Sequence, residues 1–246
     1  MTPMQQILLG VGAKKKTYLD DVFSTTLYRG NMTDRNINTG LDMSGEGGLT
    51  WLYTRSTGTG GWLFDTTRGY NKFIRSSNDA AESTETTMVS GFTSTGFSLD
   101  GDGSQSDNTN NNNTDYASWN FRKSPGFFDI VTYTGSSSAR TISHNLGCVP
   151  GAIFIKKTSG SDYWAVYNRG ADSTSPEDYY LKLNENSAHI DDANFWNDTK
   201  PTASVFSLGA AGAVNSDGNT YVAYLFAGGE STAATARSVK FDGTND

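Results

Sequence analysis

Cysteine is almost absent from this chain, which has Cys148 as the single cysteine among 246 residues. One cysteine cannot form an intrachain disulfide, so burial of apolar side chains has to stabilise the fold. Such a protein suits assembly in a reducing cytoplasm. Leu146 and Val149 stand close to Cys148, and these apolar neighbours indicate a buried, unreactive thiol.

Charged side chains and long apolar runs are scarce as well. Only 18 % of the residues are charged, and the formal net charge is -7. Binding to nucleic acid needs clustered cations, and the run Lys14–Lys16 has no further cations around it, so we expect no nucleic-acid partner. No stretch approaches the ~20 apolar residues of a membrane-spanning helix. In MTPMQQILLGVGAKKK the charges follow the apolar run, which is the reverse of a signal peptide.

The residue patterns of catalytic and metal sites are missing too. His144 and His189 are the two histidines, and they are too far apart in the sequence for paired zinc ligands. Asp100 and Asp102 resemble the start of a calcium loop, but Asn111 stands where a bidentate glutamate is needed. No nucleophile elbow, phosphate-binding glycine loop or suitably spaced carboxylate pair occurs. We therefore expect no catalytic residue, no metal and no cofactor.

What the chain does contain is typical of short strands joined by turns. It has 27 glycines and 12 % aromatic residues, and its apolar runs are brief and bounded by glycine, serine or asparagine. The best candidate for a helix is a short turn within Ser187–Phe195. Trp196 lies outside the strand-like blocks, so we predict that it is exposed and a candidate contact for a glycan.

One aromatic phrase occurs twice, as TDYASWNF at residues 114–121 and as NTYVAYLF at residues 219–226. Further blocks match in the same order, with Trp62 expected to correspond to Trp164 and Tyr116 to Tyr221. The sequence therefore predicts an all-β fold of two tandem repeated antiparallel β-sandwich modules, at residues 27–126 and 127–229.

Residues 1–26 precede both modules, and we expect them to form an extended N-terminal anchor because apolar side chains outside a module need a partner surface. The candidate anchoring residues are Leu8, Leu9, Lys14, Lys15, Lys16, Tyr18 and Phe23. Residues 230–246 are expected to be a linker and the start of a further domain, because SVKFDGTND at their end resembles the opening strand of a laminin-G or concanavalin-like jelly roll. We expect the natural protein to continue beyond it.

The second module resembles a module of large virion proteins from tailed bacteriophages, those of marine cyanophages above all. The similarity lies in FFDIVTYTG at residues 127–135, RTISHNLG at 140–147, VPG at 149–151 and WAVY at 164–167. LLGVGAKKKTY at residues 8–18 and LFDTTRG at 63–69 resemble the N-terminal region of the same proteins.

This resemblance implies a structural protein of the virion, a tail fibre assembled in the host cytoplasm. It would be a homotrimer, attached through its N-terminal part to a tail adaptor, a nozzle or another virion protein. A distal region would contact a host glycan or receptor. The family carries no catalytic residues to transfer.

Two other functions stay open at this point. A carbohydrate-binding module of an adhesin would use Trp196 and the asparagine-rich loop at residues 107–114. A capsid-decoration or head-fibre protein would share the fold of a tail fibre. A polysaccharide depolymerase would need an acidic pair that this stretch does not supply.

Overall fold

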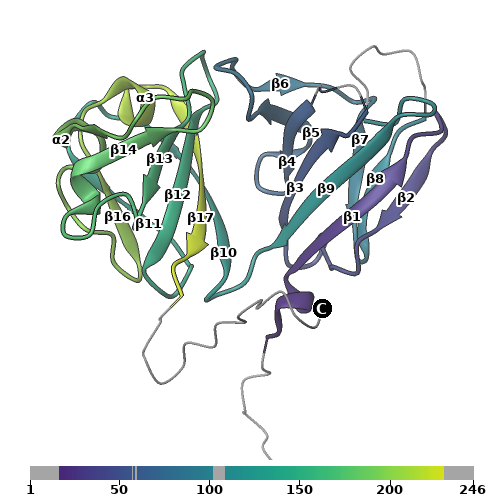
Figure 1. Cartoon of the computed structure of the whole chain (residues 1–246), viewed down its shortest axis with the longest axis horizontal. Helices are drawn as coiled ribbons and strands as arrows, with labels where there is room; N and C mark the ends of the chain where they lie inside the picture. Colours follow the sequence, from purple (N-terminus) through teal and green to yellow (C-terminus); the bar gives the residue numbers. More distant parts are fainter. Residues whose placement is uncertain (1–16, 57, 59, 102–108, 230–246) are drawn as a thin grey trace, which may run out of the picture. The chain divides into compact units, whose positions relative to one another are not determined.

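The computed structural model describes residues 17–56, 58, 60–101 and 109–229, and its elements form two compact units (Figure 1). Unit 1 comprises residues 1–75 and 83–123, and unit 2 comprises residues 76–82 and 124–246. The predicted modules met after residue 126, whereas the units meet after Lys123. A short segment, Ser76–Glu82, also belongs to unit 2 although it interrupts unit 1 in the sequence.

The described part of unit 1 is made of β-strands and one 3-10 turn. In chain order these are η1 (Leu19–Asp21), β1 (Phe23–Arg29), β2 (Arg35–Asn38), β3 (Gly48–Thr54), β4 (Gly60–Asp65), β5 (Gly69–Arg75), β6 (Ser83–Thr84), β7 (Val89–Thr93), β8 (Gly96–Leu99) and β9 (Asp115–Arg122). One antiparallel sheet has the order β1-β9-β3-β4-β5-β6, and a second has the order β2-β8-β7.

Unit 2 repeats this arrangement. Its elements are β10 (Phe128–Thr134), β11 (Arg140–Ser143), β12 (Pro150–Lys157), β13 (Ala165–Asn168), η2 (Pro176–Asp178), β14 (Tyr179–Lys182), β15 (Ile190–Asp191), α2 (Ala193–Trp196), β16 (Val205–Leu208), α3 (Gly212–Asn215) and β17 (Thr220–Ala227). The large sheet has the order β10-β17-β12-β13-β14-β15, and β11 pairs with β16 in the second layer. The all-β, antiparallel fold predicted from the sequence is confirmed.

Each unit has its own hydrophobic core between its two layers. In unit 1, Leu52, Trp62 and Tyr116 of the large sheet share a buried cluster with Ile37 and Phe97 of the small sheet. In unit 2, residues of β12, β13 and β17 share a cluster with residues of β11 and β16. Half-buried Cys148 packs against this second cluster, so burial of the lone thiol is only partial.

The repeated aromatic phrase forms equivalent strands. Tyr116 in β9 lies opposite Tyr28, and Tyr221 in β17 lies opposite Tyr133. The rings of the first pair stack with centroids 4.9 Å apart, and those of the second pair stack at 5.1 Å. Tyr116 and Tyr221 therefore correspond, as the sequence predicts.

Both units also bury an asparagine side chain at equivalent positions of the repeat. Asn110 and Asn215 are fully buried. The side-chain amide of Asn110 donates to the carbonyl oxygen of Asp100 at 3.2 Å, and that of Asn215 donates to the carbonyl oxygen of Gly209 at 2.6 Å. Buried amides hold loops firmly when their hydrogen bonds are made, so the asparagines fix one end of each sandwich.

The expected match of Trp62 with Trp164 is wrong by one residue. Trp62 lies opposite Leu52, whereas the equivalent position in unit 2, opposite Ile155, is Ala165. Successive side chains of a strand point to opposite faces, so Trp62 lies in its core cluster while Trp164 stacks on Tyr224 on the other face of its sheet. Sequence similarity located the right strand but not the face.

The expected boundary of the leader at residue 26 also needs correction. Phe23 begins β1, an edge strand paired with β9, and its ring lies 5.0 Å from that of Phe121. Val22 is buried, and its carbonyl oxygen accepts a hydrogen bond from the backbone N–H of Arg122 at 2.8 Å. The residues from Val22 onward are therefore part of unit 1 and do not belong to a separate anchor.

Candidate functional site

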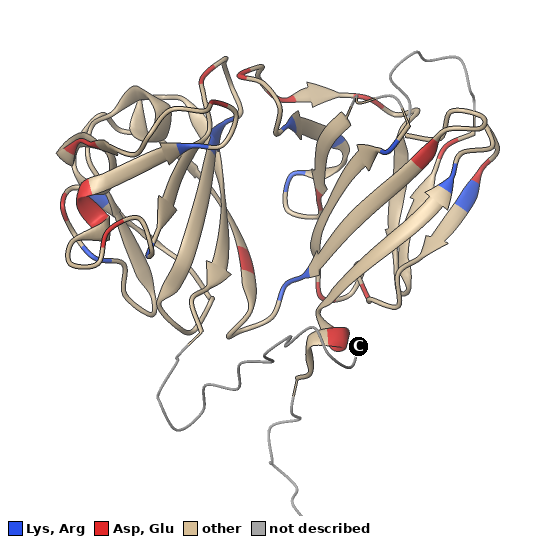
Figure 2. Cartoon of the chain, in the orientation of Figure 1, with Lys and Arg blue, Asp and Glu red and all other residues tan. Residues whose placement is uncertain are grey.

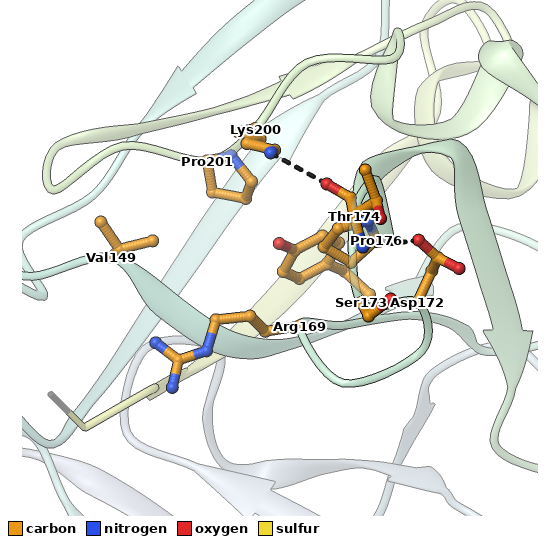
Figure 3. Close-up of a pocket in the computed structure, with 9 residues that line it drawn as sticks. Val149, Arg169, Asp172, Ser173, Thr174, Pro176, Lys200 and Pro201 are labelled. Carbon is orange, nitrogen blue, oxygen red and sulfur yellow. Dashed lines mark hydrogen bonds between the residues drawn. The ribbon is translucent and has the colours of Figure 1, made fainter. Parts of the chain in front are cut away.

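Unit 2 contains a cavity of about 370 Å³ beside β13, called the unit 2 cavity below. It is lined by Val149, Tyr167, Arg169, Asp172, Ser173, Thr174, Pro176, Lys200 and Pro201. Figure 3 shows Lys200 and Pro201 on one side, the residues Asp172 to Thr174 on another, and Arg169 with Val149 at the remaining end. The lining comes from the loop before β12, from β13, from the segment between β13 and β14, and from the loop before β16.

The floor of the unit 2 cavity is apolar and rigid. Tyr167 is only 2 % exposed, and its ring meets that of Trp196 edge to face with centroids 5.8 Å apart. Pro176 and Pro201 are also buried. Burial raises the pKa of Tyr167 to about 12, and the carboxylate of Glu177 adds to this shift. The phenol therefore keeps its proton at neutral pH and can donate a hydrogen bond.

The polar rim is held by short-range hydrogen bonds. Oδ1 of Asp172 accepts from the backbone N–H groups of Thr174 and Ser175, at 2.7 and 2.8 Å. These bonds lower the pKa of Asp172, the bond from Ser175 most of all. The turn after β13 is fixed in the same way, because Oδ1 of Asn168 accepts from the N–H of Gly170 at 2.8 Å. The carboxylate of Asp172 is thus already committed to shaping its own loop.

The two cations of the rim differ in their surroundings. Nζ of Lys200 donates to the carbonyl oxygen of Thr174 at 3.1 Å and lies 3.7 Å from Oε1 of Glu177. The carboxylate of Glu177 is nearly buried, and its Oε2 has no hydrogen-bond partner. Nη2 of exposed Arg169 donates to the carbonyl oxygens of Gly228 and Gly229, at 2.7 and 3.2 Å. Lys200 therefore has a carboxylate nearby, while the partners of Arg169 in the described chain are neutral carbonyl groups.

Trp196, the predicted glycan contact, is not at the surface. It is 2 % exposed within α2, and its Nε1 donates to the carbonyl oxygen of Tyr179 at 3.0 Å. The four residues of α2 turn the indole inward, beneath Tyr167. Trp196 packs against Tyr167 but does not line the unit 2 cavity, so the prediction of an exposed contact was wrong.

The predicted anchoring residues are only partly described. Leu8, Leu9, Lys14, Lys15 and Lys16 lie outside the described residues. Tyr18 is 63 % exposed at the start of η1, and the next residue, Leu19, is 64 % exposed. Phe23 lies in β1, as described above, so the structure does not gather Tyr18 and Phe23 into one site.

A second hollow, of about 250 Å³, lies beside η1 in unit 1 and is mainly acidic. It is lined by Thr17, Asp20, Asp21, Gly40, Asp42, Glu46 and Arg122. Nε of Arg122 donates to the carbonyl oxygen of Asp21 at 2.7 Å. Figure 2 shows the red acidic turn of η1 at the beginning of β1. Thr17, Asp20 and Asp21 of this lining belong to the predicted leader, residues 1–26.

Neither metal ligands nor a membrane span stands out in the structure. Within the described ranges, no three or more histidine, cysteine, aspartate or glutamate side chains come together as a metal site would require. Across the same residues, every helix is too short or too polar to cross a membrane.

Comparison with known families gives one match. Residues 19–234 match the family described as "Domain of unknown function (DUF7483)". The chain belongs to this family. The match spans most of both units. No curated protein and no solved structure matches the chain.

Sequence reasoning missed the residues of the unit 2 cavity. Tyr167 and Arg169 were noticed only as parts of the repeat and of the phage-like blocks, and Lys200 carried no signal. Lys200 is more than thirty positions away from Tyr167 and Arg169 in the sequence, and only the fold brings it to them. One local signal was available, because the sequence repeat aligns Arg169 with Arg68 of unit 1 although the residues before the two arginines differ.

Proposed function

We propose that this chain is a structural component of a bacteriophage virion, most simply a tail fibre. The observation that carries the proposal is the tandem repeat: two disulfide-free sandwiches with the same strand order in the large sheet and the same buried asparagine. Repeated rigid modules suit an appendage that has to span a distance without collapsing. The proposal includes no catalytic activity.

The location of the phage-like residues supports this assignment. The matching blocks of the second module fall mainly on β10, β11, β12 and β13, which are strands of the frame, and they contribute Val149 and Tyr167 to the lining of the unit 2 cavity. A resemblance carried mainly by frame strands concerns how the protein is built. Assembly as a homotrimer and attachment to a tail adaptor or nozzle remain part of the proposal.

Electron microscopy of virions labelled with antibody to this chain tests the proposal. We expect label on the tail. Label on the head would favour the capsid-decoration or head-fibre alternative, and particles without label would end the virion assignment.

A second experiment tests whether the leader attaches the chain. The described structure begins at residue 17, and Val22 and β1 belong to unit 1, so the deletion should stop at residue 16. Ordering each residue of a free segment costs about 1–2 kcal/mol of backbone entropy, which Leu8 and Leu9 offset only by burial on a partner. We expect the truncated protein to fold and to be lost from virions. Copurification at normal stoichiometry would place the attachment on the units themselves.

A second candidate function, carbohydrate binding, is favoured by the unit 2 cavity. Its buried tyrosine floor and its rim of hydroxyl and charged groups provide what a sugar ring needs, namely an apolar face and fixed hydrogen-bonding groups. The contact would therefore lie at Tyr167 and not at Trp196. A glycan array probed with this chain tests the candidate, and an array without any bound glycan would remove it.

A further inference from the structure

We propose that the unit 2 cavity binds a carboxylate-bearing sugar of a surface polysaccharide, with Arg169 holding the carboxylate. This inference rests on the second candidate function, carbohydrate binding, and names its ligand class.

Comparison of equivalent positions in the two units is the main argument. In unit 1 the fully buried carboxylate of Asp65 pairs with Arg68, with 2.5 Å between Oδ2 and Nε. In unit 2 the position equivalent to Asp65 in the strand ladder is Asn168, because Asp65 lies opposite Leu49 and Asn168 lies opposite Ala152. Arg169 directly follows Asn168 and takes the ladder position of Thr66, since its backbone N–H bonds to Gly151 as that of Thr66 bonds to Gly48. Unit 2 therefore has an amide in place of the carboxylate of Asp65 and an arginine next to it.

The chain around these arginines explains why one is buried and the other is accessible. In unit 1, residues 66–68 alone connect β4 to β5, and the side chain of Arg68 is 3 % exposed. In unit 2, residues 169–178 connect β13 to β14 and supply most of one wall of the cavity. The longer connection thus creates a cavity at the point where the compensating carboxylate is lost.

The free donors of Arg169 determine the kind of group that can bind. Only Nη2 takes part in its hydrogen bonds to Gly228 and Gly229, and these carbonyl oxygens are neutral. Nε and Nη1 have no partner among the described residues, and such a pair of N–H groups matches the two oxygens of a carboxylate. The other charges of the rim are already occupied, because Asp172 accepts two backbone N–H groups and Lys200 lies near Glu177.

The remaining lining indicates a sugar as the carrier of that carboxylate. Exposed Val149 offers apolar surface to the C–H face of a ring, above the buried Tyr167, Pro176 and Pro201, and Ser173 and Thr174 offer hydroxyl groups at the rim. A volume of about 370 Å³ lies in the range of about 300–1,000 Å³ typical of small-molecule sites. A compact, ring-shaped acid with several hydroxyl groups fits these features.

The test uses the whole chain and a glycan array that carries uronate-containing, sulfated and neutral oligosaccharides, followed by calorimetry with a uronate oligosaccharide. We expect selective binding of the uronates, weakened by salt. Arg169→Gln should reduce the affinity at least tenfold, and Arg169→Lys should restore only part of it because an ammonium cannot bind both oxygens in one plane. Asn168→Asp should act like Arg169→Gln, since it returns a carboxylate to the place that it has in unit 1.

Arg140→Gln is the matched control, because Arg140 is also an exposed arginine of unit 2 that donates to a single carbonyl group, that of Thr134. It should leave the affinity unchanged. Ser173→Trp, which fills the cavity from its rim, should abolish binding in any case where the cavity is the site.

The outcomes separate this inference from the function on which it rests. Equal binding of neutral and acidic glycans, lost in Ser173→Trp but kept in Arg169→Gln, would overturn the acidic ligand and support carbohydrate binding. Equally tight binding of sulfated sugars or of inorganic phosphate would show a site for anions in general and overturn the proposal. No binding to any glycan would overturn both.

Discussion

Unit 1 and unit 2 share a frame and differ in what is attached to it. The strand order of the large sheet, the tyrosine stack and the buried asparagine are the same in both. Unit 1 has the buried ion pair of Asp65 and Arg68, whereas unit 2 has Asn168 at the position of Asp65 and an exposed Arg169 next to it, beside a cavity. The shared strands therefore stabilise both units, and the longer connection after β13 supplies residues for a binding site in unit 2 alone.

A second difference lies on the face of the large sheet that points away from the core. Lys156 in β12 occupies the ladder position that Tyr53 has in β3, because their partners in the neighbouring strand, Val222 and Ala117, are equivalent. Lys156 is fully buried, and its Nζ donates to the carbonyl oxygens of Asp79 and Asp162, at 2.9 and 2.8 Å. Unit 2 thus uses a buried ammonium group to bind Ser76–Glu82, the segment that interrupts unit 1 in the sequence.

The largest loss of stability is expected when Asp65 of unit 1 is replaced by the asparagine that unit 2 has at the equivalent position. Asp65→Asn leaves the guanidinium of Arg68 buried without its carboxylate, which should cost about 3–5 kcal/mol of unfolding free energy. The reciprocal change, Asn168→Asp, concerns an exposed residue and should stay within about 0.5 kcal/mol. Denaturant unfolding, with amide hydrogen exchange to assign the loss to unit 1, measures both. Similar costs at the two positions would mean that the ion pair is not what distinguishes the units.

The next effect should be the same in both units. A Cβ atom at Gly30 would overlap the carbonyl oxygen of Asn111, and one at Gly135 would overlap that of Ser216. Backbone atoms cannot rotate away, so Gly30→Ala and Gly135→Ala should each cost about 3 kcal/mol or more. Hydrogen exchange in peptides from β9 and β17 would assign each loss to its own unit.

Two other glycines serve as matched controls for this pair. A Cβ at Gly91 or Gly212 meets no atom within 4 Å, so Gly91→Ala and Gly212→Ala should change stability by less than about 1 kcal/mol. If only one of Gly30→Ala and Gly135→Ala lowers the unfolding free energy, the close backbone contact at these glycines is not a shared feature of the repeat.

These positions also show how far the sequence could predict the structure. The repeated aromatic phrase predicted β9, β17 and the equivalence of Tyr116 and Tyr221, because apolar alternation and glycine-bounded runs are local signals. The further matching blocks aligned Trp62 with Trp164, and this alignment was wrong by one residue. A shift of one residue turns a strand side chain to the other face of the sheet. A match of residue types cannot detect that shift.

The candidate site was harder to predict than the frame. Tyr167 and Lys200 come from separate segments, and nothing in either segment indicates that they meet. Trp196 was expected at the surface because it stands outside the strands, yet the short helix α2 turns it into the core. Tertiary contacts decide both cases, and a single sequence contains no direct record of them.

A smaller effect should distinguish the units by pH. Desolvation lowers the pKa of Lys156 to about 8, against the opposing effect of Asp162 and Asp79. An unfolded lysine titrates near 10.4, so between about pH 8 and 10 the unfolded chain holds a proton that the folded chain has released. Lys156 alone should therefore add about 2 kcal/mol of stability across this window, while the buried tyrosines begin to lower stability as the pH approaches 10. Denaturant unfolding at pH 8, 9 and 10 measures the rise.

Variants at the two equivalent positions complete this test. Lys156→Met should remove the rise between pH 8 and 10, and Tyr53→Met in unit 1 should leave it in place. A rise that persists without Lys156 would assign the titration to another group.

The smallest effect concerns the hydroxyl groups of the stacked tyrosines. Tyr28 donates to the carbonyl oxygen of Thr109 at 2.8 Å, and Tyr133 donates to that of Val214 at 2.7 Å. Tyr28→Phe and Tyr133→Phe should each cost about 1 kcal/mol at pH 8, the usual net value of one hydrogen bond. Equal costs would show that the two tyrosine hydrogen bonds are alike in energy as well as in geometry.

The same two variants should lose their disadvantage in alkali. Burial raises the pKa of Tyr28 and of Tyr133 well above the usual value, with the neighbouring Tyr116 and Tyr221 adding to the shift. Above about pH 10 the unfolded chain releases a phenolic proton that the folded chain keeps, so stability falls as pH rises. Phenylalanine has no proton to release, so the deficit of each variant should shrink between pH 8 and 11. Tyr70→Phe, at a 45 % exposed position of β5, is the control for the removal of an exposed phenol. A deficit that is constant with pH would mean that the stacked phenols ionise as easily in the folded protein as in the unfolded chain.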